Sequence, residues 1–286
     1  MFPPDQNAVL LLTGATSGIG RATLLGLAKK IPSRLVIIGR DRARTEAQAS
    51  ELRAAGVKID CLIGDLSKRA EVLRVGQEFL DRYDRLDVLL NNAGGVFTER
   101  RLTEDGLEHT FALNHMAYFM LTCLLVPRLK AAAPSVVVSV ASAAHRNGKM
   151  HWDDLQLENN WGPGGWTAYA QSKLCNILFT RELSRKLAGT NVRAISMHPG
   201  FVASEFARNN GTIARLLMTL ASPFARTVEQ GADTLIWAAT DPGTRDLSGV
   251  YVADRKVVRP RAWAEDDAAA ARLWKISTQL SGLDCG

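Results

Sequence analysis

Residues 13–20 read Thr-Gly-Ala-Thr-Ser-Gly-Ile-Gly, and they join an apolar run at 8–13 to a segment with helical spacing at 18–30. The apolar run predicts a strand that is buried on both faces. A glycine-rich turn that leaves such a strand and opens a helix can admit a pyrophosphate, because the helix N-terminus supplies N–H donors and partial positive charge. The stretch therefore predicts a dinucleotide site. The residues expected to line it are Gly14, Thr16, Ser17, Gly18, Ile19 and Gly20.

Strand-like and helix-like segments alternate along the chain. Short apolar runs recur at 35–38, 57–63, 86–90, 135–140, 192–196 and 249–252. Segments with helical spacing lie at about 41–55, 68–81, 104–129 and 171–187. Strands separated by helices are joined by right-handed crossovers, which build a parallel sheet. We therefore expect residues 1–286 to form one α/β domain, a doubly wound Rossmann-type unit with a mainly parallel sheet flanked by helices.

Three segments depart from this alternation. Residues 145–166 are rich in Trp, Gly, Asn and Asp, and residues 201–225 follow a His-Pro-Gly turn with mixed apolar residues. Irregular segments beside the ligand-binding end of a sheet commonly shape the pocket, so we expect both to form pocket walls. From about residue 264, apolar side chains such as Leu273 and Ile276 recur at helical spacing. They predict a C-terminal helical tail that packs on the domain.

The bulk composition is that of an ordinary globular protein, with 47% hydrophobic and 22% charged residues. The net charge of +6 is scattered and accompanies no nucleic-acid motif, so we expect no nucleic-acid partner. The four cysteines form no Cys-x-x-Cys pair, and we expect reduced thiols in a cytoplasmic protein. The longest near-apolar run, 116–126, is too short to cross a bilayer, and no signal peptide is evident. We therefore expect no membrane span.

The end of the second apolar run bears on the choice of dinucleotide. A site for NAD(H) places a carboxylate there to bind the adenosine ribose hydroxyls, whereas this chain has Gly39 and Arg40. An arginine fork suits a 2′-phosphate, and Asp41 fits better as the N-cap of the next helix. We therefore predict NADP(H) in preference to NAD(H). The alternative is that Arg40 merely faces solvent.

Residues that follow the other strands are also expected to contact the cofactor, because the carboxyl ends of parallel strands meet at one edge of the sheet. Acidic and apolar residues come after the third run, small residues after the fourth, and a proline-glycine turn after the sixth. These residues are Asp65 and Leu66 beside the adenine, Asn92, Ala93 and Gly94 where the cofactor needs room, and Pro199, Gly200 and Val202 beside the nicotinamide amide.

A second motif, Tyr169-Ala-Gln-Ser-Lys173, places a phenol and an ammonium on one helical face. The ordinary pKa of a phenol, about 10, is too high for a base at neutral pH, and a nearby ammonium lowers it. Taken in isolation, the pair is better explained as an exposed amphipathic pair on a helix, because Tyr-x-x-x-Lys is common by chance. Downstream of a dinucleotide turn, it predicts hydride transfer between the dinucleotide and a carbonyl or alcohol, with Tyr169 as the proton donor and acceptor.

In their order and spacing these motifs resemble those of the classical short-chain dehydrogenase/reductase family. The matching elements are 13–20, Asp65-Leu66, 91–94, Asn114, Ser142, Tyr169-x-x-x-Lys173 and Pro199-Gly200. Within that family the chain is most similar to the retinol dehydrogenase-like group. That closer match is carried by Asn114-His115, Ala144-His145, Gly148-Lys149, 154–156, 169–176 and the tail residues 260–262 and 272–274.

The resemblance implies roles for further residues. Ser142 would donate a hydrogen bond to the substrate oxygen, with Ser139 as the alternative serine. Asn114 would hold a water near Lys173 for proton relay, and Lys173 would also bond the nicotinamide ribose. The long helix and the helix of Tyr169 resemble those with which the family forms dimers, so a homodimer is possible.

Together the motifs predict an NADP(H)-dependent oxidoreductase that acts on a small-molecule aldehyde, ketone or alcohol. Aromatic residues in the irregular segments favour a bulky apolar substrate if they face the pocket. These are Trp152, Trp161, Trp166, Phe201 and Phe206. The alternatives are a catalytically silent NADP(H)-sensing regulator of the same fold and an extended-type epimerase or dehydratase, for which the region after residue 200 is short. The histidines and cysteines form no metal-binding pattern.

Overall fold

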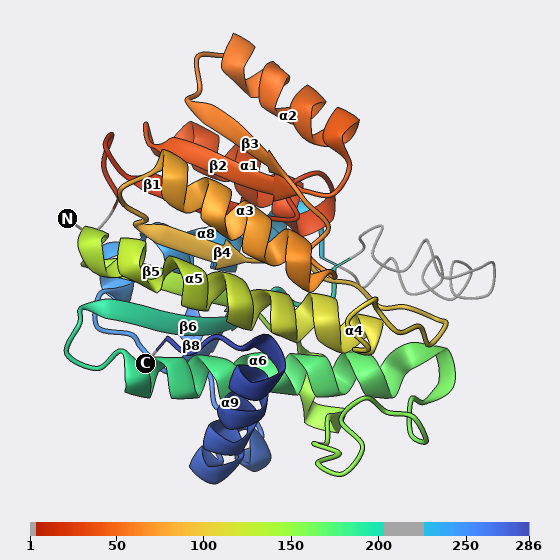
Figure 1. Cartoon of the computed structure of the whole chain (residues 1–286). Helices are drawn as coiled ribbons and strands as arrows, with labels where there is room; N and C mark the ends of the chain where they lie inside the picture. Colours follow the sequence, from red (N-terminus) through yellow and green to blue (C-terminus); the bar gives the residue numbers. More distant parts are fainter. Residues whose placement is uncertain (1–3, 203–225, 286) are drawn as a thin grey trace.

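The computed structural model describes residues 4–202 and 226–285, and in this part of the chain eight strands form one sheet (Figure 1). The strand order is β3-β2-β1-β4-β5-β6-β7-β8, and only the β7–β8 pair is antiparallel. The predicted parallel, doubly wound sheet is thereby confirmed. The strands are β1 (Val9–Thr13), β2 (Arg34–Gly39), β3 (Ile59–Ile63), β4 (Val88–Asn91), β5 (Ser135–Val140), β6 (Val192–His198), β7 (Val250–Ala253) and β8 (Lys256–Val257).

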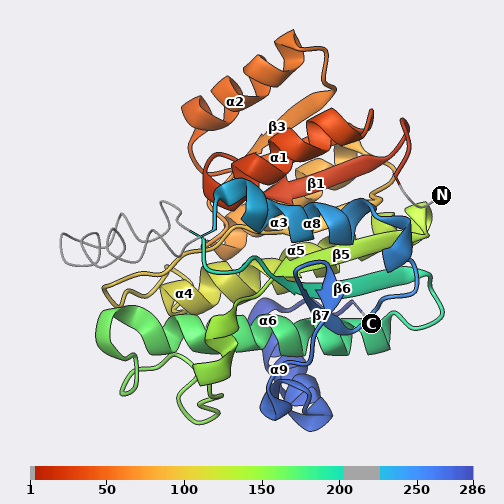
Figure 2. The same ribbon diagram turned by 180° about the vertical axis from the view of Figure 1, so that it is seen from behind.

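Helices cover both faces of the sheet. Figure 1 shows α3, α5 and α6 in front of it with α9 below, and Figure 2 shows α1 and α8 on the opposite face. The helices are α1 (Gly18–Lys30), α2 (Arg42–Ala54), α3 (Arg69–Arg82), α4 (His109–Phe111), the π-helix η1 (Ala112–Met116), α5 (Ala117–Ala132), α6 (Trp166–Lys186), α8 (Val228–Thr240) and α9 (Asp267–Ser281). Short 3₁₀ turns lie at Ala143–Asn147, Pro163–Gly165, Pro242–Thr244 and Ala262–Ala264.

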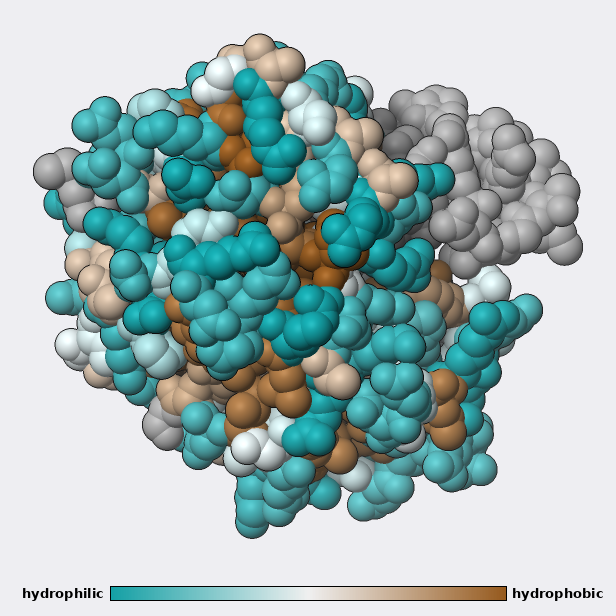
Figure 3. Space-filling model, turned by 45° about the horizontal axis from the view of Figure 1, so that its top comes forward, coloured by the Kyte–Doolittle hydropathy of each residue, from teal (hydrophilic) through white to brown (hydrophobic). Residues whose placement is uncertain are grey.

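The apolar strands read as continuous runs because both of their faces are buried. Successive side chains of a strand point to opposite faces. In β5, Val136 and Val138 join the core under α1 and α8, while Val137 joins the core under α5 and α6. The outer surface is different, and the face in Figure 3 is mostly hydrophilic, with a few apolar groups near its centre. Burial on two sides therefore fixes the sheet as the centre of the domain.

The long helical segment predicted at 104–129 starts later in the structure than the sequence indicated. It begins at His109, because the carboxylate of Glu108 caps it by accepting a hydrogen bond from Phe111 N at 2.8 Å. A π-helical turn, Ala112–Met116, then interrupts it. The whole run His109–Ala132 is 24 residues and is apolar enough to cross a membrane by length and composition, so the estimate from residues 116–126 was too short. In the fold, 83% of its most apolar window is buried inside the protein.

Two other elements differ from the sequence prediction. Helix α6 begins at Trp166 rather than 171, directly after a turn in which Gly162, Gly164 and Gly165 all have positive φ. Left-handed backbone of this kind favours glycine, so the turn ends the irregular segment at a defined point. Helix α8 was not predicted, although Thr227 and Gln230 form a capping box at its start.

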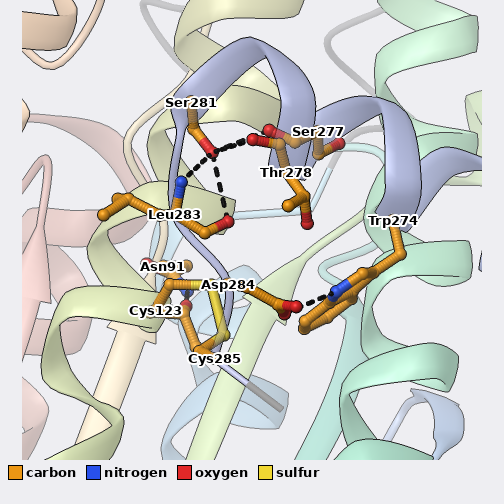
Figure 4. The surroundings of a disulfide bond; sticks show 10 residues. Asn91, Cys123, Trp274, Ser277, Thr278, Ser281, Leu283, Asp284 and Cys285 are labelled. Atoms are coloured by element: carbon orange, nitrogen blue, oxygen red, sulfur yellow. Dashed lines mark hydrogen bonds between the residues drawn. A yellow bond between two sulfur atoms is a disulfide. The ribbon is translucent and has the colours of Figure 1, made fainter.

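The C-terminal tail forms α9, which packs on α6 as predicted. Beyond it the chain turns at Gly282, whose φ is 72°, and returns to α5, where Cys285 forms a disulfide with Cys123 (Figure 4). The expectation of four reduced thiols is therefore wrong for this pair, whereas Cys61 and Cys175 are free. The bonded cysteines are 162 positions apart in the sequence, and no local pattern indicates that they pair.

We predict that Cys285→Ser lowers the free energy of unfolding by about 2–5 kcal/mol, because the disulfide closes a long loop in the unfolded chain. Chemical denaturation with and without a dithiol measures the change. Cys61→Ser, which removes a free and partly exposed thiol, is the matched control and should stay within about 0.5 kcal/mol of the wild type. Equal stability of the wild type in oxidised and reduced form would contradict the prediction.

Candidate active site

The glycine turn after β1 has the shape that a pyrophosphate site needs. Gly14 has a φ of 70°, and a Cβ there would lie 2.8 Å from the Cα of Ala93. A Cβ on Gly20 would lie 2.0 Å from the carbonyl oxygen of Gly14, so α1 packs closely against the turn. Ser17 caps α1 without a side-chain hydrogen bond, and the first turn of α1 carries no acidic residue. The N–H groups of this turn are therefore suited to an anion.

Two polar side chains join this turn to the loop after β4. The Thr13 hydroxyl accepts hydrogen bonds from the N–H groups of Asn92 and Ala93, both at 2.9 Å. The Asn92 amide donates to the carbonyl oxygens of Thr13 at 2.8 Å and Gly14 at 3.2 Å. The two predicted cofactor segments are thus held as one unit. Thr13 was not singled out from the sequence, although it is the first residue of the quoted motif.

The end of β2 has no room for an acidic side chain. A Cβ on Gly39 would lie 2.1 Å from the hydroxyl of Thr45, which itself donates a hydrogen bond to the carbonyl oxygen of Asp41. Asp41 caps α2 by accepting from Arg44 N at 3.0 Å, as predicted. Arg40 is exposed at this corner. The residues present therefore suit an anionic group and lack the carboxylate that would bind ribose hydroxyls.

The remaining predicted cofactor residues lie at the same edge of the sheet. Asp65 follows β3 and accepts hydrogen bonds from the N–H and the hydroxyl of Ser67, while Leu66 is buried in the core. Beyond β6, Gly200 has a φ of 84°. A Cβ on Gly231 of α8 would lie 2.6 Å from Val202, 3.3 Å from Ile19 and 3.5 Å from the carbonyl oxygen of Pro199. Gly231 therefore lets the proline-glycine turn approach the glycine turn, a role that the sequence did not reveal.

The Tyr169 phenol lies beside Ser142, directly beyond the end of β5. The Ser142 hydroxyl forms a hydrogen bond with the phenol and accepts one from Ala144 N at 3.1 Å. Ser139, the alternative serine, lies within β5 and is 1% exposed. The structure thus brings Ser142, and not Ser139, to the phenol.

Lys173 is held one helical turn after Tyr169. Its Nζ donates a hydrogen bond to the carbonyl oxygen of Val140 at 2.9 Å and lies 5.7 Å from the centre of the Tyr169 ring. Asn176 Nδ2 donates to the same carbonyl oxygen at 3.1 Å. The phenol and the ammonium therefore share one face of α6, as the spacing predicts.

Asn114 lies in the π-helical turn and fastens the loop after β4 to α6. Its Oδ1 accepts from Gly95 N, and its Nδ2 donates to Gly95 O, both at 2.9 Å. Nδ2 also donates to the hydroxyl of Ser172 at 3.0 Å. A Cβ on Gly94 would lie 2.9 Å from Asn114 Oδ1 and 3.6 Å from Lys173 Nζ. Gly94 thus lies close to both side chains, and a larger residue there would crowd Asn114.

Burial governs the protonation of the phenol and the ammonium. It raises the pKa of Tyr169 to about 12, although the hydrogen bond from Ser142 opposes the rise. It lowers the pKa of Lys173 to about 7. Burial of the phenol, rather than its ammonium neighbour, therefore decides the pKa of Tyr169 in this structure. The phenol is neutral at pH 7 and can donate a proton.

Two histidines support the Ser142 loop. His198 Nδ1 accepts a hydrogen bond from Ala143 N at 3.2 Å. His145 Nδ1 lies 2.7 Å from the carbonyl oxygen of Ser142, and its ring packs edge-on against Tyr251. Burial lowers the pKa of both imidazoles. Neither role can be read from local sequence, because both depend on contacts across the fold.

The tryptophans of the irregular segment at 145–166 differ in what they contact. Trp166 lies beside Tyr169, with ring centres 5.7 Å apart. Trp161 donates a hydrogen bond to the buried carboxylate of Glu108 at 3.2 Å. Trp152 instead lies under Arg272 of α9, with the guanidinium 4.5 Å from its ring centre. Phe206 and the rest of 203–225 lie outside the described residues.

We predict that the ligand-free protein gains stability as the pH rises from about 7 to about 8.5. In this range the unfolded chain holds a proton on Lys173 that the folded protein has released, because the folded pKa is about 7 and the unfolded value is 10.5. The slope from this group is at most about 1.4 kcal/mol per pH unit. Denaturation of the wild type and of Lys173→Met at each pH measures it, and an equal slope in both proteins would refute the prediction.

Comparison with known proteins places this geometry in a family. The family model of short chain dehydrogenases matches residues 8–154. Retinol dehydrogenase 12 of Homo sapiens is 40% identical over 279 residues, which are 96% of this chain and 86% of that protein. Retinol dehydrogenase 14 of Mus musculus is 39% identical over 97% of this chain and 87% of that protein.

Solved structures agree with this placement. The crystal structure of an uncharacterized protein from Mycobacterium paratuberculosis has a TM-score of 0.80 and 32% identity, and the match covers 99% of this chain and 97% of that chain. The RhlG/NADP complex of Pseudomonas aeruginosa has a TM-score of 0.68 and 25% identity, over 87% and 96%. The chain therefore belongs to the short-chain dehydrogenase family, as a retinol dehydrogenase-like oxidoreductase that acts on CH–OH or C=O groups.

Proposed function

We propose that the protein transfers a hydride between NADP(H) and the carbonyl or hydroxyl group of a bulky apolar small molecule. The observation that carries this proposal is the placement of Tyr169 beside Ser142 and Lys173, at the same edge of the sheet as the glycine turn. Ligands bind at this edge in doubly wound sheets. A proton donor therefore lies beside the place where a dinucleotide would present its reactive end.

The bound cofactor would supply the hydride, and the protein supplies the proton and the hydrogen bonds. The glycine turn and Arg40 would hold its phosphates, and Lys173 would bond its nicotinamide ribose. In reduction, the neutral Tyr169 phenol donates its proton to the substrate oxygen as negative charge develops there, and the Ser142 hydroxyl donates a hydrogen bond to the same atom. Asn114 holds the relay that returns a proton by way of Lys173.

The preference for NADP(H) is supported by the corner at the end of β2. Arg40 is exposed there, and the carboxylate of the next residue, Asp41, caps α2 and pairs with Arg44. The space at Gly39 is closed by Thr45. RhlG, which shares a quarter of its residues with this chain over the matched region, was solved with NADP. A 2′-phosphate would find a cation at this corner and no competing carboxylate at position 39.

The bulky apolar substrate is supported by the side chains around the phenol. Trp166 lies one turn before Tyr169 and is half exposed, so its ring is available to a substrate that approaches the phenol. Phe201 is equally exposed beyond the proline-glycine turn. Relatives of this chain are named retinol dehydrogenases, and exposed aromatic rings suit an apolar alcohol such as retinol.

The silent regulator is not favoured, since Tyr169 and Lys173 are both present and correctly disposed. A homodimer stays a prediction that no observation tests. A cytoplasmic location also stays a prediction. Cytosolic reductants usually keep cysteine pairs reduced. Whether Cys123 and Cys285 are oxidised or reduced in cells would therefore report the compartment.

We predict that the wild type oxidises NADPH in the presence of bulky apolar aldehydes or ketones, and that Tyr169→Phe lowers kcat by at least about 10²-fold, because the proton donor is lost. The NADPH Kd, measured by fluorescence titration, should change less than about twofold, since the phenol hydroxyl is not part of the phosphate site. Binding of NADPH without turnover across a broad panel of aldehydes and ketones would reject the proposal in favour of the silent regulator.

Arg40→Asp should weaken NADPH and favour NADH, because the substitution removes a cation from a 2′-phosphate and adds a carboxylate for ribose hydroxyls. We expect the ratio of kcat/KM for NADPH over NADH to fall by about 10²-fold or more. Arg42→Asp, at the first residue of α2, is the control for the general loss of positive field. An unchanged ratio in Arg40→Asp, or an equal change in Arg42→Asp, would refute the assignment.

A further inference from the structure

The C-terminal helix α9 lies over the seam between α5 and α6. The Trp274 ring stacks on Phe179 of α6, with centres 5.9 Å apart and planes 13° apart. It also meets Phe119 of α5 edge-on, with centres 5.0 Å apart. Trp274 is buried, and its indole N–H donates to the carboxylate of Asp284 at 3.2 Å (Figure 4). One side chain of the tail therefore contacts α6, which carries Tyr169 and Lys173, and α5, which continues the π-helical turn of Asn114.

Both ends of α9 are fastened to these helices. At its start, Asp267 forms an ion pair with Arg181 of α6. At its end, the chain returns to α5 through the disulfide between Cys285 and Cys123 (Figure 4). The carbonyl oxygen of Ser281 also accepts a hydrogen bond from Arg69 of α3 at 2.9 Å. The register of α9 along the seam is thus set at three points.

This register brings Ser277, three residues after Trp274, to His115. The Ser277 hydroxyl and His115 Nε2 are 2.9 Å apart, and both residues are fully buried. A buried hydrogen bond of this kind meets no competition from water, and loss of one partner leaves the other unsatisfied. His115 also packs against Phe111 and Phe179, with ring centres 5.2 Å and 6.1 Å away. The imidazole is therefore fixed in position and orientation.

His115 directly follows Asn114 within the π-helical turn. The two side chains leave the turn on different sides, since Asn114 bonds Gly95 and Ser172 whereas His115 bonds α9. A π-helical turn is wider than an α-helical one and recurs at functional sites, where it redirects a side chain. The peptide between these two residues is therefore held from both sides.

We propose that Ser277 is a positioning residue for the reaction, which acts through His115 to hold Asn114 at the end of the proton path to Lys173. The C-terminal helix thereby positions a group of the candidate site in addition to packing on the core. This inference rests on the proposed function, because Asn114 matters only if a proton moves at this site. Burial keeps His115 neutral, with a pKa lowered to about 3, so the hydrogen bond persists over the working pH range.

The test compares Ser277→Ala with Thr278→Val, which removes the adjacent hydroxyl of α9. Among the described residues the Thr278 hydroxyl has no hydrogen-bond partner, which makes this variant a matched control. Ser277→Ala should lower kcat about tenfold and raise the solvent isotope effect on kcat, because proton return becomes slower. The NADPH Kd should stay within about twofold of the wild type. Ser277→Thr keeps a hydroxyl and should retain the isotope effect of the wild type.

A second measurement needs no turnover. Amide hydrogen exchange across residues 109–120 should be faster in Ser277→Ala than in Thr278→Val, because only the first variant releases His115. Wild-type kinetics and exchange in Ser277→Ala, or a loss of kcat in Ser277→Thr equal to that in Ser277→Ala, would overturn the inference. If the wild type turns over no carbonyl substrate, the proposed function fails, and the exchange comparison alone decides whether α9 holds the turn.

Discussion

The carbonyl oxygen of Val140, the last residue of β5, accepts hydrogen bonds from both Lys173 and Asn176 of α6. A buried ammonium is tolerated only where such a partner exists, so this one carbonyl fixes the rotation and register of α6 against the end of the sheet. Tyr169 then falls one turn earlier on the same face and meets Ser142, two residues beyond Val140. The candidate site is therefore built outward from a backbone atom whose position the sheet determines.

The same burial decides which proton is available. Because Tyr169 is buried, its phenol keeps its proton at neutral pH, and because Lys173 is buried, its charge is only partly retained. The ligand-free site thus carries little charge of its own, while the cations and N–H groups that attract phosphates lie at the glycine turn and at Arg40. A neutral donor beside an anion-binding turn is suited to carbonyl reduction, in which the substrate oxygen needs a proton.

Local patterns revealed the parts of the structure that have a local cause. A strand such as β5 is buried on both faces, and its sequence is therefore a continuous apolar run. The glycine turn and the Tyr169–Lys173 spacing follow from backbone geometry. Contacts between distant segments left no such trace. Neither the disulfide of Cys285 nor the approach of Ser277 to its histidine can be read from sequence, since both depend on where α9 docks. The pKa of Tyr169 cannot be read from sequence for a related reason, because depth of burial is a property of the folded chain. Helix α8 is different, because its Thr227–Gln230 capping box was readable and was overlooked.

The close contact between Gly39 and Thr45 has a consequence for how such an enzyme could change its coenzyme over evolutionary time. An acidic residue at position 39 would collide with the Thr45 hydroxyl, which in turn helps to hold the first turn of α2 through Asp41. A lineage that changed to NAD(H) by placing a carboxylate at position 39 would first need a smaller residue at position 45. It would then lose the hydrogen bond that Thr45 makes in the first turn of α2. Close packing at position 39 therefore obstructs this one route to a ribose-binding carboxylate.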